Sequence, residues 1–187
     1  MTTAVYSPLA ERFFPDVSST RDGLLILGGA ALTALCAQVY VPWQPVPFTL
    51  QTLAVTLIGL AFGARLAFGA TLAYLAAGAF GLPVFAQGMS GSGVLTGTTA
   101  GYLIAFPIVA AALGHATECG WTRDWRGRAV ALIAANIAIL AVGAVWLSQY
   151  VGTEQAWTLG VAPFISGAVA KSVIVWALLP VAEKLKS

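Results

Sequence analysis

Long apolar segments alternate with short polar connections along almost the whole chain. A helix that crosses about 30 Å of hydrocarbon needs about 20 residues, most of them apolar. Six segments meet this description, at about 23–41, 48–63, 65–80, 98–116, 128–149 and 162–179. Only Gly63, Ala64 and Arg65 separate the second from the third, which predicts a tight helical hairpin. The pattern predicts an all-α, polytopic membrane protein with six transmembrane helices.

We expect a single membrane domain, because no stretch has the composition of a separate soluble unit. Its expected parts are an N-terminal tail over 1–22, a six-helix bundle over about 23–180 and a C-terminal tail over 181–187. Within the first tail, Pro8–Phe14 either lies along the membrane surface or is only partly ordered. No cleavable signal peptide is expected, because the first apolar run does not end at a small-residue cleavage site.

The composition supports a membrane protein. Hydrophobic residues make up 59% of the 187 residues and charged residues only 9%, against about 25% in soluble domains. A net charge of +2 is too small and too scattered to indicate nucleic-acid binding. Cys36 and Cys119 lie far apart with no metal-binding spacing, so we expect two buried or idle thiols.

The basic residues test the six-segment layout independently. With six spans, eight of the nine basic residues fall on one side of the membrane: Arg12, Arg21, Arg65, Arg123, Arg126, Arg128, Lys184 and Lys186. The connections on the other side contain no Lys or Arg. Because cytoplasmic loops are enriched in Lys and Arg, both termini are predicted to be cytoplasmic.

One uncharged stretch, 81–102, reads GLPVFAQGMSGSGVLTGTTAGY. It contains six glycines and is too apolar for an ordinary solvated loop. Non-helical backbone at membrane depth occurs where it is buried in protein or lines a cavity. We therefore expect this stretch to line a cavity on the non-cytoplasmic side, with 86–97 acting as a lid.

Lys171 is the ninth basic residue and lies inside the sixth segment. A lysine at the centre of a span costs on the order of 2.5–3.5 kcal/mol. All seven acidic residues lie outside the predicted spans, so none of them is an intramembrane partner. Snorkelling to the interface is one explanation; the other is that Lys171 faces a cavity and binds the carboxylate of a ligand.

The connection after the first segment, VPWQPVPFTLQT, contains three prolines that prevent a continuous helix. After the last of these prolines, the second segment opens with Phe48, Thr49, Gln51 and Thr52. Thr49 is equally well explained as a helix cap. Together with the glycine-rich stretch and Lys171, these side chains predict a pocket that opens to the outside.

Four motifs resemble those of a known family: PVPFTLQT at 45–52, GLPVFA at 81–86, LTGTTAGY at 95–102 and PFISGAVAK at 163–171. In order and spacing they are similar to the BioY family, the biotin-specific S components of energy-coupling factor (ECF) transporters. The resemblance extends from about 24 to 180. It implies the six-helix S-component fold and uptake of biotin across the bacterial cytoplasmic membrane.

The resemblance also implies which residues bind the ligand. The biotin-binding candidates are Phe48, Thr49, Gln51, Gly88, Gly91, Gly93, Tyr102, Asn136 and Lys171. A helix–helix hydrogen bond explains Asn136 equally well. This chain departs from the family pattern at Thr98-Thr99, where Pro-Thr is usual, and at Ala168, where an Asp three residues before the lysine is usual.

The implied partners are biotin, a transmembrane coupling subunit, ABC ATPase subunits and the lipid bilayer. In the family, small residues on the first helix contact the coupling subunit. Ala30 and Ala34, with Gly29 and Ala37 extending the same face, are the candidates, although small residues four apart are also common in internal packing. No cofactor is expected, and ATP is used only by the partner subunits.

Two alternatives remain from other classes. Gly88-Met89-Ser90-Gly91 fits the GxSG motif of rhomboid-type proteases, but the sole histidine, His115, is expected at the opposite membrane face. The second alternative is a solitary vitamin transporter that acts as a homo-oligomer. The chain has no ATP-binding motif, so ATP-driven uptake needs separate subunits, and we expect a transport protein rather than an enzyme.

Overall fold

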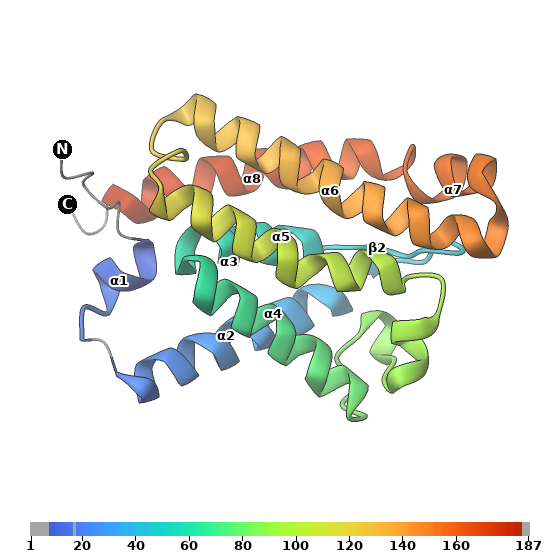
Figure 1. The fold of residues 1–187 in the computed structure, drawn as a ribbon, viewed down its shortest axis with the longest axis horizontal. Helices are drawn as coiled ribbons and strands as arrows, with labels where there is room; N and C mark the ends of the chain where they lie inside the picture. The colour runs from blue at the N-terminus through green and yellow to red at the C-terminus, as the bar shows by residue number, and fades with distance from the viewer. Residues whose placement is uncertain (1–7, 17, 185–187) are drawn as a thin grey trace.

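The computed structural model describes residues 8–16 and 18–184, with side chains described up to Pro180. The described chain is mostly helical (Figure 1). Its elements are α1 (Leu9–Phe13), α2 (Ser19–Gln38), β1 (Tyr40–Val41), β2 (Phe48–Thr49), α3 (Gln51–Phe62), α4 (Ala64–Ala79), the 3-10 turns η1 (Ala86–Gly88) and η2 (Ser92–Thr96), α5 (Ala100–Glu118), α6 (Trp125–Val151), α7 (Thr153–Gly160) and α8 (Phe164–Lys184). Each of the six predicted apolar segments therefore corresponds to one helix.

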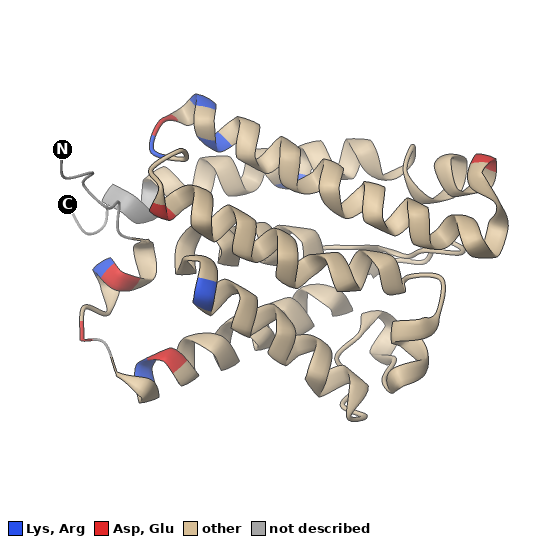
Figure 2. Ribbon diagram, viewed as in Figure 1, with Lys and Arg blue, Asp and Glu red and all other residues tan. Residues whose placement is uncertain are grey.

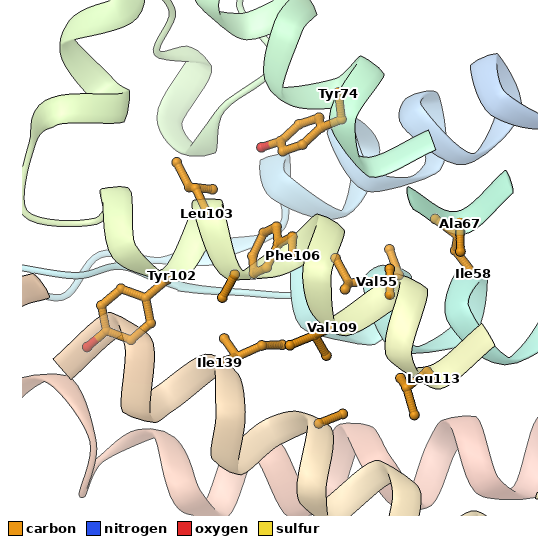
Figure 3. Close-up of a cluster of buried hydrophobic side chains, with 14 of the residues drawn as sticks. Val55, Ile58, Ala67, Tyr74, Tyr102, Leu103, Phe106, Val109, Leu113 and Ile139 are labelled. Carbon is orange, nitrogen blue, oxygen red and sulfur yellow. The ribbon is translucent and has the colours of Figure 1, made fainter. Parts of the chain in front are cut away.

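Helix α5 lies at the centre of the bundle. It packs against α3 and α4 on one side and against α6 on the other. Figure 3 shows Phe106 and Val109 of α5 between Val55 of α3 and Ile139 of α6. All four side chains are buried, so α5 connects the two halves of the apolar core.

The predicted hairpin between the second and third segments is confirmed. α3 ends at Phe62 and α4 begins at Ala64, with Gly63 between them at φ 81°. The backbone N–H of Ala64 donates to Oε1 of Glu118 at 2.8 Å, which ties the turn to the end of α5. Gly114 of α5 packs directly against the backbone of the turn, where a side chain would collide with it.

Not every helix is long enough to cross a membrane alone. Within the described residues, α2, α5 and α6 are long and apolar enough, and α8 meets the same test only together with α7, at a bend of 43°. α3 and α4 have 12 and 16 residues, fewer than the about 20 that a perpendicular span needs. The count of six spans and the side of each terminus therefore stay predictions.

Most of the charged residues that the structure describes gather at one end of the bundle (Figure 2), whereas Lys171 lies within α8. Arg21 and Asp22 open α2, Arg65 opens α4, and Asp22 pairs with both arginines. Helix α7, which contains Glu154, lies at the opposite end (Figure 1). This separation agrees with the basic residues sharing one membrane face; Lys186 lies outside the described residues.

The connections contain structure that the hydrophobic pattern did not predict. Between α2 and α3 the chain forms an antiparallel β1–β2 pair in which Tyr40 faces Thr49, so the second helix begins at Gln51 rather than at Phe48. The connection between α6 and α8, which the apolar pattern left without an element, contains α7, an eight-residue helix packed on α6. The segment Pro8–Phe14 forms α1, whose buried Ala10 anchors it to the bundle.

The glycine-rich stretch is non-α-helical between α4 and α5, as expected. It consists of η1, η2 and extended links. Gly88 and Gly91 have positive φ values of 69° and 90°, and Gln87, which is not a glycine, also lies in the left-handed region at φ 63°. Such conformations are rare outside glycine, so this backbone is held in place by its surroundings.

Candidate functional site

A cavity lies between the glycine-rich stretch, the start of α3 and the inner faces of α5, α6 and α8. Its polar lining residues are Thr49, Gln51, Thr52, Thr99, Tyr102, Asn136 and Lys171. Apolar walls come from Phe85 and Met89 in the glycine-rich stretch, Phe106 of α5 and Phe164 of α8. The cavity measures about 70 Å³, well below the about 300–1,000 Å³ of typical small-molecule sites. A vitamin-sized ligand therefore requires the surrounding segments to move outward.

A chain of hydrogen bonds crosses the cavity wall from α8 to α4. The Lys171 ammonium donates to the carbonyl of Thr49 at 3.0 Å. The Thr49 hydroxyl donates to Oε1 of Gln51 at 2.8 Å and accepts the backbone N–H of Gln51 at 3.3 Å. Nε2 of Gln51 then donates to the Tyr74 hydroxyl at 2.5 Å. These bonds fix the polar wall before any ligand binds.

Lys171 has a cationic head but no anionic partner in the described part of the chain. Its hydrogen-bond partner there is the neutral carbonyl of Thr49, and no described carboxylate lies within 4.0 Å of its ammonium. A half-buried cation is stabilised far better by an anion than by a carbonyl dipole. The cavity therefore favours a ligand that carries a negative charge.

Thr52 lies three residues after Thr49, in the first turn of α3, and also lines the cavity. Its hydroxyl is buried and has no hydrogen-bond partner among the described residues. A buried hydroxyl without a partner costs about 1–3 kcal/mol. Among the described residues, the cavity thus offers an incoming ligand the unpartnered hydroxyl of Thr52 and the Lys171 cation, which has no anionic partner there.

Aromatic rings close one side of the cavity. Phe48 stacks on Phe164 with ring centroids 4.2 Å apart, and Trp43 meets Phe48 edge-on at 5.8 Å. The Tyr102 ring lies 6.4 Å from Phe164, and its hydroxyl donates to the carbonyl of Gly160 at 2.8 Å. The β-hairpin, α5, α7 and α8 are therefore joined at this wall.

The glycine-rich stretch is fastened at both of its ends. Nε2 of Gln38 donates to the carbonyl of Phe85 at 3.1 Å, and Nε1 of Trp146 donates to the carbonyl of Gly97 at 2.9 Å. The Thr98 hydroxyl donates to the carbonyl of Pro45 in the β-hairpin at 3.2 Å. Between these two ends most residues are exposed, and the backbone N–H of Gly91 donates to the carbonyl of Gly78 near the end of α4 at 2.7 Å. We call this stretch, which covers the cavity, its roof.

Comparisons with known proteins agree with this architecture. The sequence pattern of the BioY family matches residues 8–187. This chain belongs to the BioY family. A protein named probable biotin transporter BioY from Pyrococcus horikoshii is 37% identical over 156 residues, which cover 83% of this chain and 90% of that protein. Biotin transporter BioY2 of Lactococcus lactis is 34% identical over 160 residues, or 81% and 84% of the two chains.

A solved structure also shares the fold. The crystal structure of the S-component for biotin from an ECF-type ABC transporter has a TM-score of 0.78 and 21% sequence identity, and the match covers 90% of this chain and 95% of that one. This places the BioY chain in the S-component fold. The relatives are named as transporters, so the family assignment identifies a transport protein rather than an enzyme.

The structure brings most, but not all, of the predicted site residues of this BioY chain together. Thr49, Gln51, Tyr102, Asn136 and Lys171 line one cavity although they come from four different parts of the sequence. The other predicted residues are not in its lining. Phe48 lies behind Phe164, and the glycines at 88, 91 and 93 shape the backbone above the cavity.

For Asn136 the sequence left two interpretations open, biotin binding and a helix–helix hydrogen bond, and the structure contains the hydrogen bond. Its Nδ2 donates to the Ser172 hydroxyl on α8 at 3.0 Å and to the carbonyl of Leu132 at 3.0 Å. Ala168, three residues before Lys171, lines the cavity as well. Both residues therefore form part of the seam between α6 and α8.

Sequence reasoning missed several residues that shape the site. Tyr74 is the end of the hydrogen-bond chain, Phe85 packs edge-on against it at 5.5 Å, and Phe164 forms the aromatic wall. A buried tyrosine usually has a hydrogen-bond partner, and this general rule is the one signal in the sequence that could have identified Tyr74. The other two lie within motifs already noted at 81–86 and 163–171.

The small residues of α2 fall into two groups. Gly29 and Ala37 are buried, and a side chain at position 29 would collide with Ala70 of α4, so both serve internal packing. Ala30 and Ala34 are half-buried at the margin of the core. The expected continuous face of four small residues is therefore divided, and only Ala30 and Ala34 stay candidates for a partner contact.

The protease alternative has no geometric support. Ser90 lies in the glycine-rich stretch before α5, whereas His115 lies 15 residues beyond Ala100, about 22 Å along that helix. His115 instead approaches the Cys119 sulfur at 3.5 Å. A serine and its base must lie within hydrogen-bond reach, so these two cannot form a catalytic pair.

Proposed function

We propose that this chain captures biotin from outside the bacterial cytoplasmic membrane as the substrate-binding subunit of an ECF transporter. The observation that carries the proposal is Lys171, a half-buried cation that faces a cavity in which the described residues supply no anion. The names of the relatives supply the ligand class.

Biotin matches the cavity chemically. Its carboxylate supplies the negative charge that Lys171 lacks, and its thioether ring and alkyl chain match the walls formed by Phe106, Leu103 and Phe164. Its polar ureido group needs hydrogen-bond partners in an otherwise apolar site, and the free hydroxyl of Thr52 is one such partner. The side chains of Gln51 and Thr49 are already hydrogen-bonded to each other, so we assign them two roles: they hold the polar side of the cavity in place, and they contact the ligand.

We infer that the roof moves when biotin is captured, and the small volume of the cavity supports this. The part between the two fastened ends, Gln87 to Gly93, is exposed except at Gly91, whose backbone N–H donates to the carbonyl of Gly78 at 2.7 Å and gives up this bond when the part moves outward. This part lies at the end of the bundle opposite the cluster of charged residues (Figure 2), which is the predicted outer face. Its outward displacement enlarges the cavity and admits a ligand from that side.

Isothermal titration of the purified protein in detergent tests the proposal, with biotin, thiamine and riboflavin compared. We expect heat of binding with biotin in the absence of ATP and metal, and no comparable heat with the other two vitamins. A protein that melts cooperatively but shows neither heat nor a thermal shift at micromolar biotin contradicts the proposal.

Transport requires partners that supply ATP hydrolysis, and we assign their contact to α2. Ala30 and Ala34 present small, partly exposed surface there, where a helix of the coupling subunit can approach closely. Ala34→Leu is expected to leave biotin binding intact and to impair co-purification with coupling and ATPase subunits. Ala134→Leu, at an exposed position of α6, is the matched control. If both variants co-purify with the coupling and ATPase subunits as well as the wild-type protein does, Ala34 belongs to internal packing instead.

A further inference from the structure

A second hollow lies on the outside of the α6–α8 pair. It is a groove of about 940 Å³ lined almost entirely by apolar side chains. Trp125 of α6 and Trp176 of α8 stand at one end, and Trp157 of α7 stands at the other. Tryptophan gathers at membrane–water interfaces, so the groove runs through the thickness of the bilayer.

The end of the groove at Trp125 is the basic one. The Arg126 guanidinium lies 5.1 Å from the centre of the Trp125 ring, and Arg123 is exposed two residues before that ring. The carboxylate of Asp124 accepts the backbone N–H of Gly127 at 3.2 Å and caps α6. This mouth therefore carries more positive than negative charge and faces the membrane surface.

The half of the groove next to this mouth has the length of one lipid leaflet. Trp125 and Asn136 are 11 residues apart on α6, about 16 Å, or half of the about 30 Å hydrocarbon core. Ile133 of α6 and Val173 of α8 line this half and are more than half exposed. The lining of this half combines these bulky side chains with the small residues Ala129 and Ser172, which leaves an apolar hollow along α6 that a flexible acyl chain can fill.

We propose that this half of the groove binds one phospholipid with an anionic headgroup. Its phosphate lies at Arg126 and Arg123, and an acyl chain runs along Ala129 and Ile133 toward Asn136. The basic mouth matches the charge of the headgroup, and the apolar floor matches the chain. The proposal does not depend on biotin binding.

Native mass spectrometry of the delipidated full-length protein tests this site. Dioleoyl-phosphatidylglycerol and dioleoyl-phosphatidylcholine are titrated separately, since they share their acyl chains and differ in headgroup charge. We expect the anionic lipid to bind at least about fivefold more tightly, and Arg126→Gln to remove about that factor. The charge-matched control is Arg12→Gln in α1, which lies away from the α5–α6 connection (Figure 1) and should keep the preference.

A second pair of variants tests the apolar floor. Ala129 lines the groove, whereas Ala134 is exposed on the same helix and does not line it. Ala129→Phe should fill the groove and weaken binding of both lipids, and Ala134→Phe should not. Equal binding of the two lipids by wild type, or equal losses in Arg126→Gln and Arg12→Gln, overturns the proposal. The lipid proposal is also overturned if a protein occupies the groove instead. In that case binding of a coupling subunit, or formation of a dimer, would displace the lipid and cover position 129.

Discussion

The seam between α6 and α8 has two faces that differ in chemistry. Asn136, Leu140 and Ala168 line both the enclosed cavity and the outer groove, so a single layer of side chains separates them. On the inner face, Lys171 donates to the carbonyl of Thr49. On the outer face, Val169, two residues earlier on α8, is 59% exposed and lines an apolar surface.

The difference shows where a membrane protein keeps its polar groups. Helices α6 and α8 contribute only Asn136 and Lys171 to the polar part of the cavity. The remaining polar groups come mainly from places where helices start, such as Thr49 and Gln51 at the beginning of α3. Backbone that is not α-helical can bring its own polar atoms to a cavity, whereas the outer face must stay apolar against lipid.

Removing the cation should have the largest effect. Lys171→Met is expected to weaken biotin by about 2–5 kcal/mol, at least about 30-fold, because it leaves the ligand carboxylate without its charge partner. Isothermal titration measures this loss. The same variant should melt at a higher temperature without ligand, because it removes a partly buried cation whose hydrogen-bond partner among the described residues is the neutral Thr49 carbonyl.

A biotin amide that lacks the carboxylate serves as the control ligand for Lys171. It should lose little affinity in Lys171→Met, since it has no charge to pair. Equal losses for biotin and its amide would instead assign Lys171 to the structure of the cavity wall, and its contact with Thr49 would then be its whole role.

Moving a lysine to the other face of α8 should have the next largest effect. Val169→Lys places a cation in the apolar groove and is expected to destabilise the protein by up to about 2.5–3.5 kcal/mol. Thermal unfolding in lipid nanodiscs measures this cost, with Gln155→Lys on the exposed face of α7 as control. If both variants unfold at the wild-type temperature, the two faces of the seam do not differ in their tolerance of charge.

The long helices could be predicted because their apolar content alone distinguishes them from the polar connections. The turn at Gly63 was found from a single break in an otherwise continuous apolar region, and its place is confirmed. α7 could not be found in this way, because its eight residues mix Thr, Glu and Trp and show no long apolar run. Its helical form depends on packing against α6, which only the folded chain provides.

Part of the site could be predicted because Lys171 is costly wherever it lies in the span. A charged side chain inside a membrane span is energetically costly and usually has a function, and this argument predicted that Lys171 faces a cavity, which it lines. The bond from Gln51 to Tyr74 joins residues 23 apart on two helices, and no local pattern in the sequence connects them. The same holds for Gln38, whose amide holds the carbonyl of Phe85 across 47 residues.

Two glycines of the roof of the cavity test its role in binding. Gly91 has φ 90° and ψ 161°, a conformation that costs other residues about 1–3 kcal/mol. Gly93 does not have a positive φ, and a side chain there would meet nothing within 4 Å. Gly91→Ala should therefore weaken biotin measurably in titration, while Gly93→Ala should match wild type. Identical affinities for both variants would remove the roof from the binding site.

The smallest expected effect concerns a single hydroxyl. Thr52→Val should weaken biotin by about 1 kcal/mol, roughly fivefold, because the buried hydroxyl of Thr52 has no partner other than the proposed ligand among the described residues. Thr56 is the matched control one turn along α3, since its hydroxyl donates to the carbonyl of Thr52 at 2.8 Å and does not line the cavity. Thr56→Val should lower the melting temperature and spare biotin, whereas Thr52→Val should spare the melting temperature and weaken biotin. The reverse assignment would show that the ligand does not reach the start of α3, and the polar wall would then serve the fold rather than the vitamin.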